Sequence, residues 1–169
     1  PGMTVTAPKD GAEMMALVRL GIQQEDGPFS VRWPRDAVPE AVPHVSEIPD
    51  IEYGTWEILR RGSDIAFLAT GTMVGAASAA AEALGSRGFQ AEVVNCRFLK
   101  PHDREVLKDV AERHRHVITI EEGAVVNGFG AHMARELSAL ASEHTIDVRC
   151  LGLPDEFVQH GGRDELLRN

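Results

Sequence analysis

Arg32 and Arg35 are the residues best suited to bind an anion. They flank Trp33-Pro34, directly after Phe29 to Arg32, a stretch with the alternation of a half-buried strand. A rigid turn at a strand end can present a guanidinium for two parallel hydrogen bonds to a phosphate or a carboxylate. Exposed arginines before a linker are also common, so the residue types alone leave anion binding and a solvated role both open.

Thr70-Gly71-Thr72 is a second place where a ligand could bind. It joins a predicted core strand to a helix, where open α/β sheets bind ligands and helix N-termini attract phosphate. The sequence lacks the Gly-x-Gly-x-x-Gly spacing and the Walker lysine, so a backbone cradle for nucleotide phosphates is not encoded. We therefore favour a plain tight turn.

Glu121 and Glu122 follow another predicted strand, where paired carboxylates could act as acid and base or bind a metal. Adjacent residues on an extended chain point to opposite faces, however. We expect one of the two to face solvent or a partner, and we favour a structural or interface role over catalysis.

His114 and His116 could ligate a metal from one face of a strand, but no third ligand lies nearby in the sequence. The simpler interpretation is that Arg113 to Arg115 end a helix, where positive charge complements the helix dipole.

Cys96 and Cys150 are far apart and form no Cys-x-x-Cys pair, which favours buried free thiols in a reducing cytoplasm. We predict no catalytic, cofactor-binding or metal-binding residue in this chain.

The elements that would position these residues form a regular alternation of strands and helices. Short runs rich in strand-forming residues predict core strands at Ile65 to Ala69, Ala91 to Val94, Val117 to Ile120 and Asp147 to Leu151. Helical patterns lie between them at Met73 to Leu84, Asp103 to His114 and Gly130 to Ala141. Right-handed crossovers then give an α/β fold with a mostly parallel sheet and helices on both faces. Trp56 to Leu59 would add a fifth strand at the edge, running the other way.

The residues before this alternation read as a smaller, separate unit. Thr4 to Thr6 is a short predicted strand, and Asp10 with Glu13 forms a capping-box pattern that opens a helix. A stretch with Pro39, Pro43 and Pro49 follows and is typical of a stiff linker. We therefore divide the chain into residues 1–38, a proline-rich linker at 39–52, and a domain at 53–169.

Composition excludes several classes of protein. The chain has 169 residues, 43% of them hydrophobic and 25% charged, which fits a globular soluble protein. A formal charge of -9 would repel nucleic acid and anionic lipid, so neither is an expected partner. No apolar run approaches the ~18 residues of a membrane span, and no secretion signal is evident. The chain starts without a methionine, next to a predicted strand, as if entered midway.

Several segments form an ordered set of motifs: Ala7 to Asp10, Gly27 to Arg35, Gly71 to Met73, Arg97 to Asp103, Thr119 to Gly123, Gly128 to Gly130 and Gly152 to Gly161. This order resembles one family, the 1-deoxy-D-xylulose-5-phosphate synthases, which are transketolase-like thiamine-diphosphate enzymes. Transketolases and the β subunits of 2-oxo acid dehydrogenases share the Glu-Glu-Gly and Gly-Phe-Gly stretches. The Lys-Pro-His-Asp and Gly-Leu-Pro-Asp segments are more similar to the synthases.

The resemblance implies a homodimeric cytoplasmic transferase that condenses pyruvate with glyceraldehyde 3-phosphate, with loss of CO2, for isoprenoid precursor synthesis by the methylerythritol phosphate route. In that family thiamine diphosphate and Mg²⁺ are bound by upstream domains, through a Gly-Asp-Gly motif and a glutamate that are absent here. Residues 1–38 would be the end of the middle, pyrimidine-binding domain. Residues 53–169 would be the C-terminal domain at the dimer interface. The chain alone would be structural and inactive, binding no cofactor.

One functional residue is implied by the resemblance: Arg35 falls on the arginine that binds the phosphate of glyceraldehyde 3-phosphate. The sequence departs from the family pattern at Trp33, where the family has tyrosine, and at Asp36, where it has glycine. Two alternatives stay open. One is a subunit of a split transketolase or 2-oxo acid dehydrogenase, and the other is a non-enzymatic α/β module that binds an anion or a protein.

Overall fold

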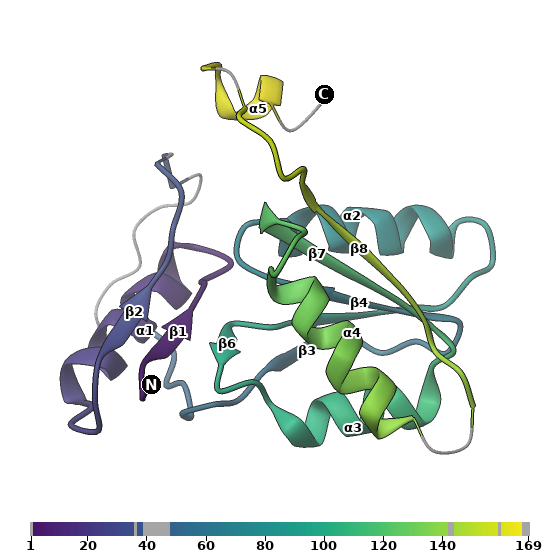
Figure 1. Cartoon of the computed structure of the whole chain (residues 1–169), viewed down its shortest axis with the longest axis horizontal. Coiled ribbons are helices and arrows are strands. Elements are labelled where there is room, and N and C mark those ends of the chain that lie inside the picture. The colour runs from purple at the N-terminus through teal and green to yellow at the C-terminus, as the bar shows by residue number, and fades with distance from the viewer. Residues whose placement is uncertain (1, 36, 39–47, 142–143, 159, 167–169) are drawn as a thin grey trace.

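A computed structural model describes residues 2–35, 37–38, 48–141, 144–158 and 160–166. Its larger sheet has five strands in the order β3-β5-β4-β7-β8 (Figure 1). They are β3 (Glu57–Arg60), β4 (Ile65–Ala69), β5 (Ala91–Asn95), β7 (His116–Ala124) and β8 (Asp147–Leu153). The edge strand β3 runs antiparallel to β5 and the other pairs are parallel. The predicted α/β class and the mostly parallel sheet with one reversed edge strand are confirmed, so the sheet is mixed.

Helices cover both faces of this sheet, as predicted (Figure 1). On one face lies α2 (Met73–Gly85), whose buried Ala77 and Ala81 belong to the same core cluster as Phe67 and Val93. On the other face lie α3 (Arg104–Arg113) and α4 (Phe129–Leu140), with Leu107 and Met133 in the larger cluster. Beyond β8 the chain extends away from the sheet to the short helix α5 (Arg163–Leu166).

A second sheet has three strands, two from before the predicted linker and one from after it. Its order is β2-β1-β6, where β1 (Thr4–Thr6) pairs in parallel with β2 (Phe29–Val31) and antiparallel with β6 (Phe98–Lys100). Helix α1 (Gly11–Gln23) connects β1 to β2. The sequence predicted β1, α1 and β2 but missed β6, which belongs to the C-terminal part of the chain. Leu17 of α1 is fully buried in the same core cluster as Trp56 and Phe98. The small unit therefore completes its core with residues of the large one.

The linker and the two cysteines were also predicted from the sequence, with different outcomes. Most of the predicted linker, residues 39–47, lies outside the described residues, and the proposed domain limits stay a prediction. Cys96 is buried and Cys150 is only partly buried, and both are free thiols. Among the described residues, no helix is long and apolar enough to span a membrane.

Candidate functional site

The carboxyl ends of strands from both sheets face one another across a cleft of about 170 Å³. Ala7 and Pro8 line it after β1, Arg32 to Pro34 after β2, Thr70 to Thr72 after β4, and Glu121 with Glu122 near the end of β7. The carboxyl ends of strands are where α/β sheets place their ligands. The structure therefore brings together three groups that the sequence singled out separately.

Thr70-Gly71-Thr72 is a tight turn, as the sequence favoured. Gly71 has a φ of 57°, in the left-handed region that glycine adopts without strain. The Thr70 N–H donates to Ile120 O at 3.0 Å, which ties the turn to β7. A Cβ at Gly71 would lie 3.6 Å from the Ala7 Cβ, so this turn contacts the N-terminal unit. It forms one wall of the cleft.

Glu121 supports the start of α4. Its side chain is buried, and its two oxygens accept hydrogen bonds from Phe129 N at 3.0 Å and Gly130 N at 2.8 Å. A carboxylate at a helix N-terminus satisfies free N–H groups and complements the helix dipole. The N-cap residue itself is Gly128, where a Cβ would lie only 2.6 Å from Glu121 Oε1. A larger residue there would displace the carboxylate.

Glu122 points to the opposite face of the sheet, as side-chain alternation requires. Its Oε2 accepts a hydrogen bond from Thr72 Oγ1 at 2.8 Å, at the start of α2. The two carboxylates thus each contact the first turn of a different helix. This arrangement agrees with a structural role. The two carboxylates bind different helices on opposite faces of the sheet, so they do not lie side by side as an acid and base pair.

Arg32 and Arg35 have different surroundings. The Arg32 N–H donates to Thr6 O at 2.9 Å, and its side chain lines the cleft. A Cβ at Gly123 would lie 3.8 Å from Arg32 Nη2 and 2.9 Å from Glu121 Oε2, so the guanidinium lies beside the Glu121 to Gly123 segment. Arg35 is exposed on the turn beyond Pro34, with no ion pair to any described residue. Asp36, the departure noted above, lies outside the described residues.

A polar network that the sequence did not reveal joins the two units beside the cleft. Glu13 of α1 is 1% exposed and accepts hydrogen bonds from Lys9 N at 2.7 Å and from Asn95 Nδ2 at 2.8 Å. Lys9 Nζ also lies 2.9 Å from Glu57 Oε2, and Arg97 Nη1 lies 3.6 Å from Glu13 Oε1. Asn95 and Glu57 belong to the large sheet, so the network crosses between the units. The capping-box pattern marked Glu13 as a residue at a helix start, but no local pattern linked it to Asn95 or Glu57.

The network shifts the pKa values of Lys9 and Glu57 in the direction that keeps each of them charged. Burial alone would lower the pKa of Lys9, but Glu13, Glu57 and Asp10 together raise it. Burial alone would raise the pKa of Glu57, but hydrogen bonds from Lys9 and Asn95 lower it. Opposite charges stabilise the ionised form of each other in this way.

The two histidines considered as metal ligands are not brought together. His114 is fully buried at the end of α3, with its Nε2 3.1 Å from Arg113 Nη1. The His116 side chain is mostly exposed and lies 3.8 Å from Asp147. Within the part of the chain that the structure describes, no group of three potential metal ligands is assembled.

Comparison with protein families gives one match, to the family described as transketolase, C-terminal domain, over residues 54–169. Among known proteins, the chain is similar to 1-deoxy-D-xylulose-5-phosphate synthases. It is 36% identical to the one from Lysinibacillus sphaericus over 99% of this chain, and 40% identical to the one from Trichormus variabilis over 98%. It is 41% identical to 1-deoxy-D-xylulose-5-phosphate synthase 1 from Geobacter sulfurreducens, again over 98%. The chain spans only 26% of the length of each of these relatives.

Among solved structures, the fold is similar to that of a protein described as "Split gene transketolase, inactive beta4 tetramer". The TM-score is 0.79 and the sequence identity is 35%. The similarity covers 92% of this chain and 50% of that one.

Proposed function

This chain belongs to the transketolase family through its C-terminal domain, and from that premise we propose that it acts as the C-terminal portion of a 1-deoxy-D-xylulose-5-phosphate synthase. The observation that carries the proposal is the extent of the similarity. Identity of 36% to 41% to synthases continues over nearly the whole chain, including the residues before position 54 that the family model does not match. Those residues include the turn with Arg32 and Arg35.

The proposed full-length enzyme condenses pyruvate with glyceraldehyde 3-phosphate, with loss of CO2, in the cytoplasm and as a homodimer. Thiamine diphosphate would supply the means to stabilise the two-carbon unit after decarboxylation. The residues of this chain do not fit that cofactor or its Mg²⁺, because the sequence has no Gly-Asp-Gly motif and the described residues assemble no metal-ligand group. We therefore assign cofactor binding to other residues of the full-length protein.

We assign Arg35 the role of binding the substrate phosphate. Its side chain is exposed and makes no ion pair with the described residues, so its guanidinium can meet a phosphate without giving up a protein partner. Two parallel N–H···O bonds would fix the orientation of the aldehyde. The backbone bond from Arg32 to Thr6 and the rigid Pro34 hold the turn that carries Arg35.

The test is a graft in which this chain replaces the matching C-terminal part of the Geobacter sulfurreducens synthase. Changing Arg35→Ala in the graft should raise KM for glyceraldehyde 3-phosphate at least about tenfold, because charge-assisted hydrogen bonds are lost. KM for pyruvate should stay unchanged, and Arg87→Ala, which removes an exposed arginine after α2, should have no effect. An unchanged KM for the aldehyde in Arg35→Ala would contradict the assignment.

A second candidate is the subunit of a split transketolase that works with a separate partner chain. The solved structure with 35% identity favours it, since its description names a split gene transketolase. The two candidates differ in the donor substrate. A transketolase subunit would support two-carbon transfer between sugar phosphates, whereas the synthase would require pyruvate.

A further inference from the structure

A second cavity, of about 580 Å³, lies at the end of the large sheet where its parallel strands begin. We call it the amino-end cavity. The residues that line it include Asp64, Ile65, Leu84, Phe89, Arg115 and His116. Ile65 is the first residue of β4 and His116 is the first residue of β7. The cleft described above is lined by residues after the carboxyl ends of these strands, so the two sites lie at opposite ends of the sheet. The volume is in the range of pockets for small molecules.

One wall of the amino-end cavity is apolar and fixed in place. Phe89 is 52% exposed and lines the amino-end cavity together with Leu84 and Ile65. Its backbone is not loose, because the Phe89 N–H donates to Leu84 O at 3.1 Å after the left-handed Gly88. The Phe89 ring, Leu84 and Ile65 therefore offer a preformed apolar surface.

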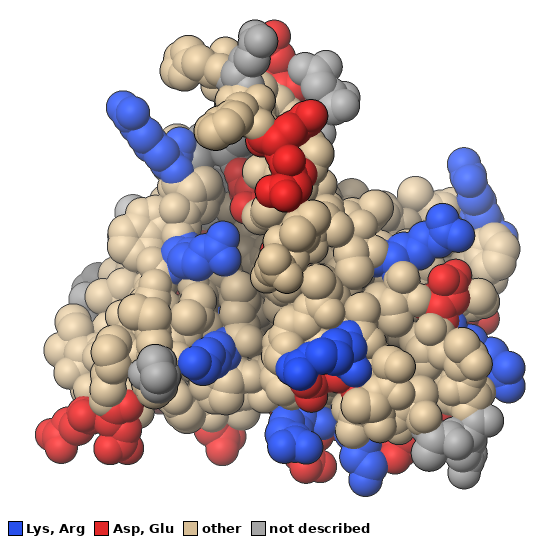
Figure 2. Space-filling view, in the orientation of Figure 1, with Lys and Arg blue, Asp and Glu red and all other residues tan. Residues whose placement is uncertain are grey.

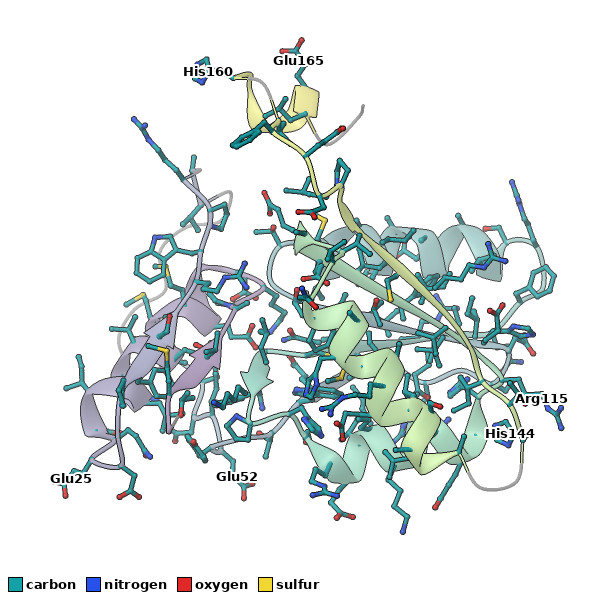
Figure 3. All side chains as sticks on the ribbon, in the orientation of Figure 1. Glu25, Glu52, Arg115, His144, His160 and Glu165 are labelled. Atoms are coloured by element: carbon teal, nitrogen blue, oxygen red, sulfur yellow. The ribbon has the colours of Figure 1, made fainter. Side chains whose placement is uncertain are left out.

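Arg115 also lines the amino-end cavity and has no carboxylate partner among the residues that the structure describes. Arg115 makes no ion pair with any described residue, and its backbone is held where α3 passes into β7 by the bond from Asp147 N to Arg115 O at 2.8 Å. Figure 3 shows Arg115 near His144 at the margin of the molecule, far from His160 and Glu165. His116 also lines the cavity, and its Nδ1 lies 3.8 Å from Asp147 Oδ2, which leaves Nε2 as its donor for a ligand.

The other charged groups of the cavity are already engaged. Arg113 binds Asp109 through Nε at 2.9 Å and the buried Glu92 through Nη2 at 2.7 Å. The Asp64 carboxylate accepts a hydrogen bond from Gln90 N at 2.6 Å. Recognition of an anion in this cavity therefore falls on Arg115 and His116. In a chain with a net charge of -9, such binding needs direct contacts rather than general attraction.

We propose that the amino-end cavity binds a phosphate monoester with an apolar body. Arg115 forms paired hydrogen bonds to the phosphate, His116 contacts a third phosphate oxygen, and the apolar body packs on Phe89 and Leu84. This site is independent of the phosphate site proposed at Arg35. It involves no covalent step.

The test is an NMR titration of amide shifts in this chain with phenyl phosphate as the probe. Saturable shifts should appear at Leu84, Phe89 and His116. Arg115→Ala should weaken binding at least about tenfold, because charge-assisted hydrogen bonds are lost, and Phe89→Ala should weaken it several-fold. All of these residues except Leu84 are exposed, so the variants should fold normally.

Two controls separate this site from others. Arg104→Ala removes an exposed arginine at the other end of α3, and Arg35→Ala removes the proposed substrate arginine. Both should leave the affinity within about twofold, and inorganic phosphate should bind at least about tenfold more weakly than phenyl phosphate. The proposal is overturned if Arg115→Ala binds as well as the unchanged chain, if the shifts fail to saturate, or if Arg35→Ala is the variant that loses binding. None of these results would bear on KM values in the grafted enzyme.

Discussion

Glu92 is a carboxylate with no exposed surface, held on β5 by residues at the end of α3. Its Oε1 accepts a hydrogen bond from Arg113 at 2.7 Å, and its Oε2 lies 3.6 Å from His114 Nε2. Burial alone would raise the pKa of Glu92, but His114 and Arg113 lower it to about 2. A folded-state pKa below the unfolded value means that the ionised group stabilises the fold above the unfolded pKa. That contribution is lost as pH falls from about 4.5 towards 2.

We predict that Glu92→Gln is less stable than the unchanged chain by about 3 kcal/mol at pH 7, because lowering the pKa of Glu92 from 4.5 to about 2 corresponds to about 1.4 kcal/mol of stability per pH unit. The difference should shrink steadily as pH falls below about 4.5. Urea unfolding followed by circular dichroism between pH 7 and pH 3 measures it. Glu112→Gln, at an exposed position of α3, is the control. A difference that stays constant with pH would contradict this account.

Single residues show where sequence reasoning succeeds and where it stops. The helix-capping role of Asp10 was predicted and is observed, since its side chain accepts from Glu13 N at 2.7 Å. A capping box would have Glu13 accept from the backbone N–H of Asp10, whereas the observed donor is the N–H of Lys9, one residue earlier. The bond of Glu13 to Asn95, 82 positions along the chain, could not be predicted because no local pattern specifies a partner at that distance. The role of Arg35 rests on family resemblance and stays a prediction.

At the scale of elements, the strands with long apolar runs were predictable and β6 was not. Only two residues lie between the end of β5 and Phe98–Lys100, which stops at Pro101, so no turn residues separate it from the strand before it. It is nevertheless the strand that joins the two units, because it pairs with β1 while its chain neighbours belong to the large domain. Together with the Glu13 network, β6 fixes α1 and its flanking strands against the large sheet. The walls of the cleft depend on that attachment.

We predict that Glu13→Gln loosens this attachment, because it removes the negative charge that Lys9 and Arg97 share. Hydrogen exchange of the amides in α1 should become at least about tenfold faster, while the amides of β4 and β7 keep their protection. Glu25→Gln is the control, since Glu25 lies just beyond α1 and points away from the molecule (Figure 3). Unchanged protection of α1 in Glu13→Gln would show that β6 pairing and the shared core around Leu17 hold the units together without the Glu13 charge.

At the scale of the whole molecule, two sheets meet with the carboxyl ends of their strands around one cleft. On the face shown in Figure 2, acidic and basic side chains are interspersed. Helix α1 carries an apolar stripe whose members Val18 and Ile22 are 37% and 81% exposed. An apolar stripe identifies a helix face that must be buried, but it does not identify the protein surface that buries it. For that reason the fold class was predictable and the assembly was not.

The measurement that tests the central claim most directly is the product formed by the graft of this chain onto the upstream part of the Geobacter sulfurreducens synthase. With thiamine diphosphate and Mg²⁺, the account predicts release of CO2 from pyruvate and formation of 1-deoxy-D-xylulose 5-phosphate with glyceraldehyde 3-phosphate. Circular dichroism and gel filtration would first establish that the graft is folded. A folded graft that forms no such product, or that only transfers two-carbon units between sugar phosphates, would contradict the assignment to the synthase.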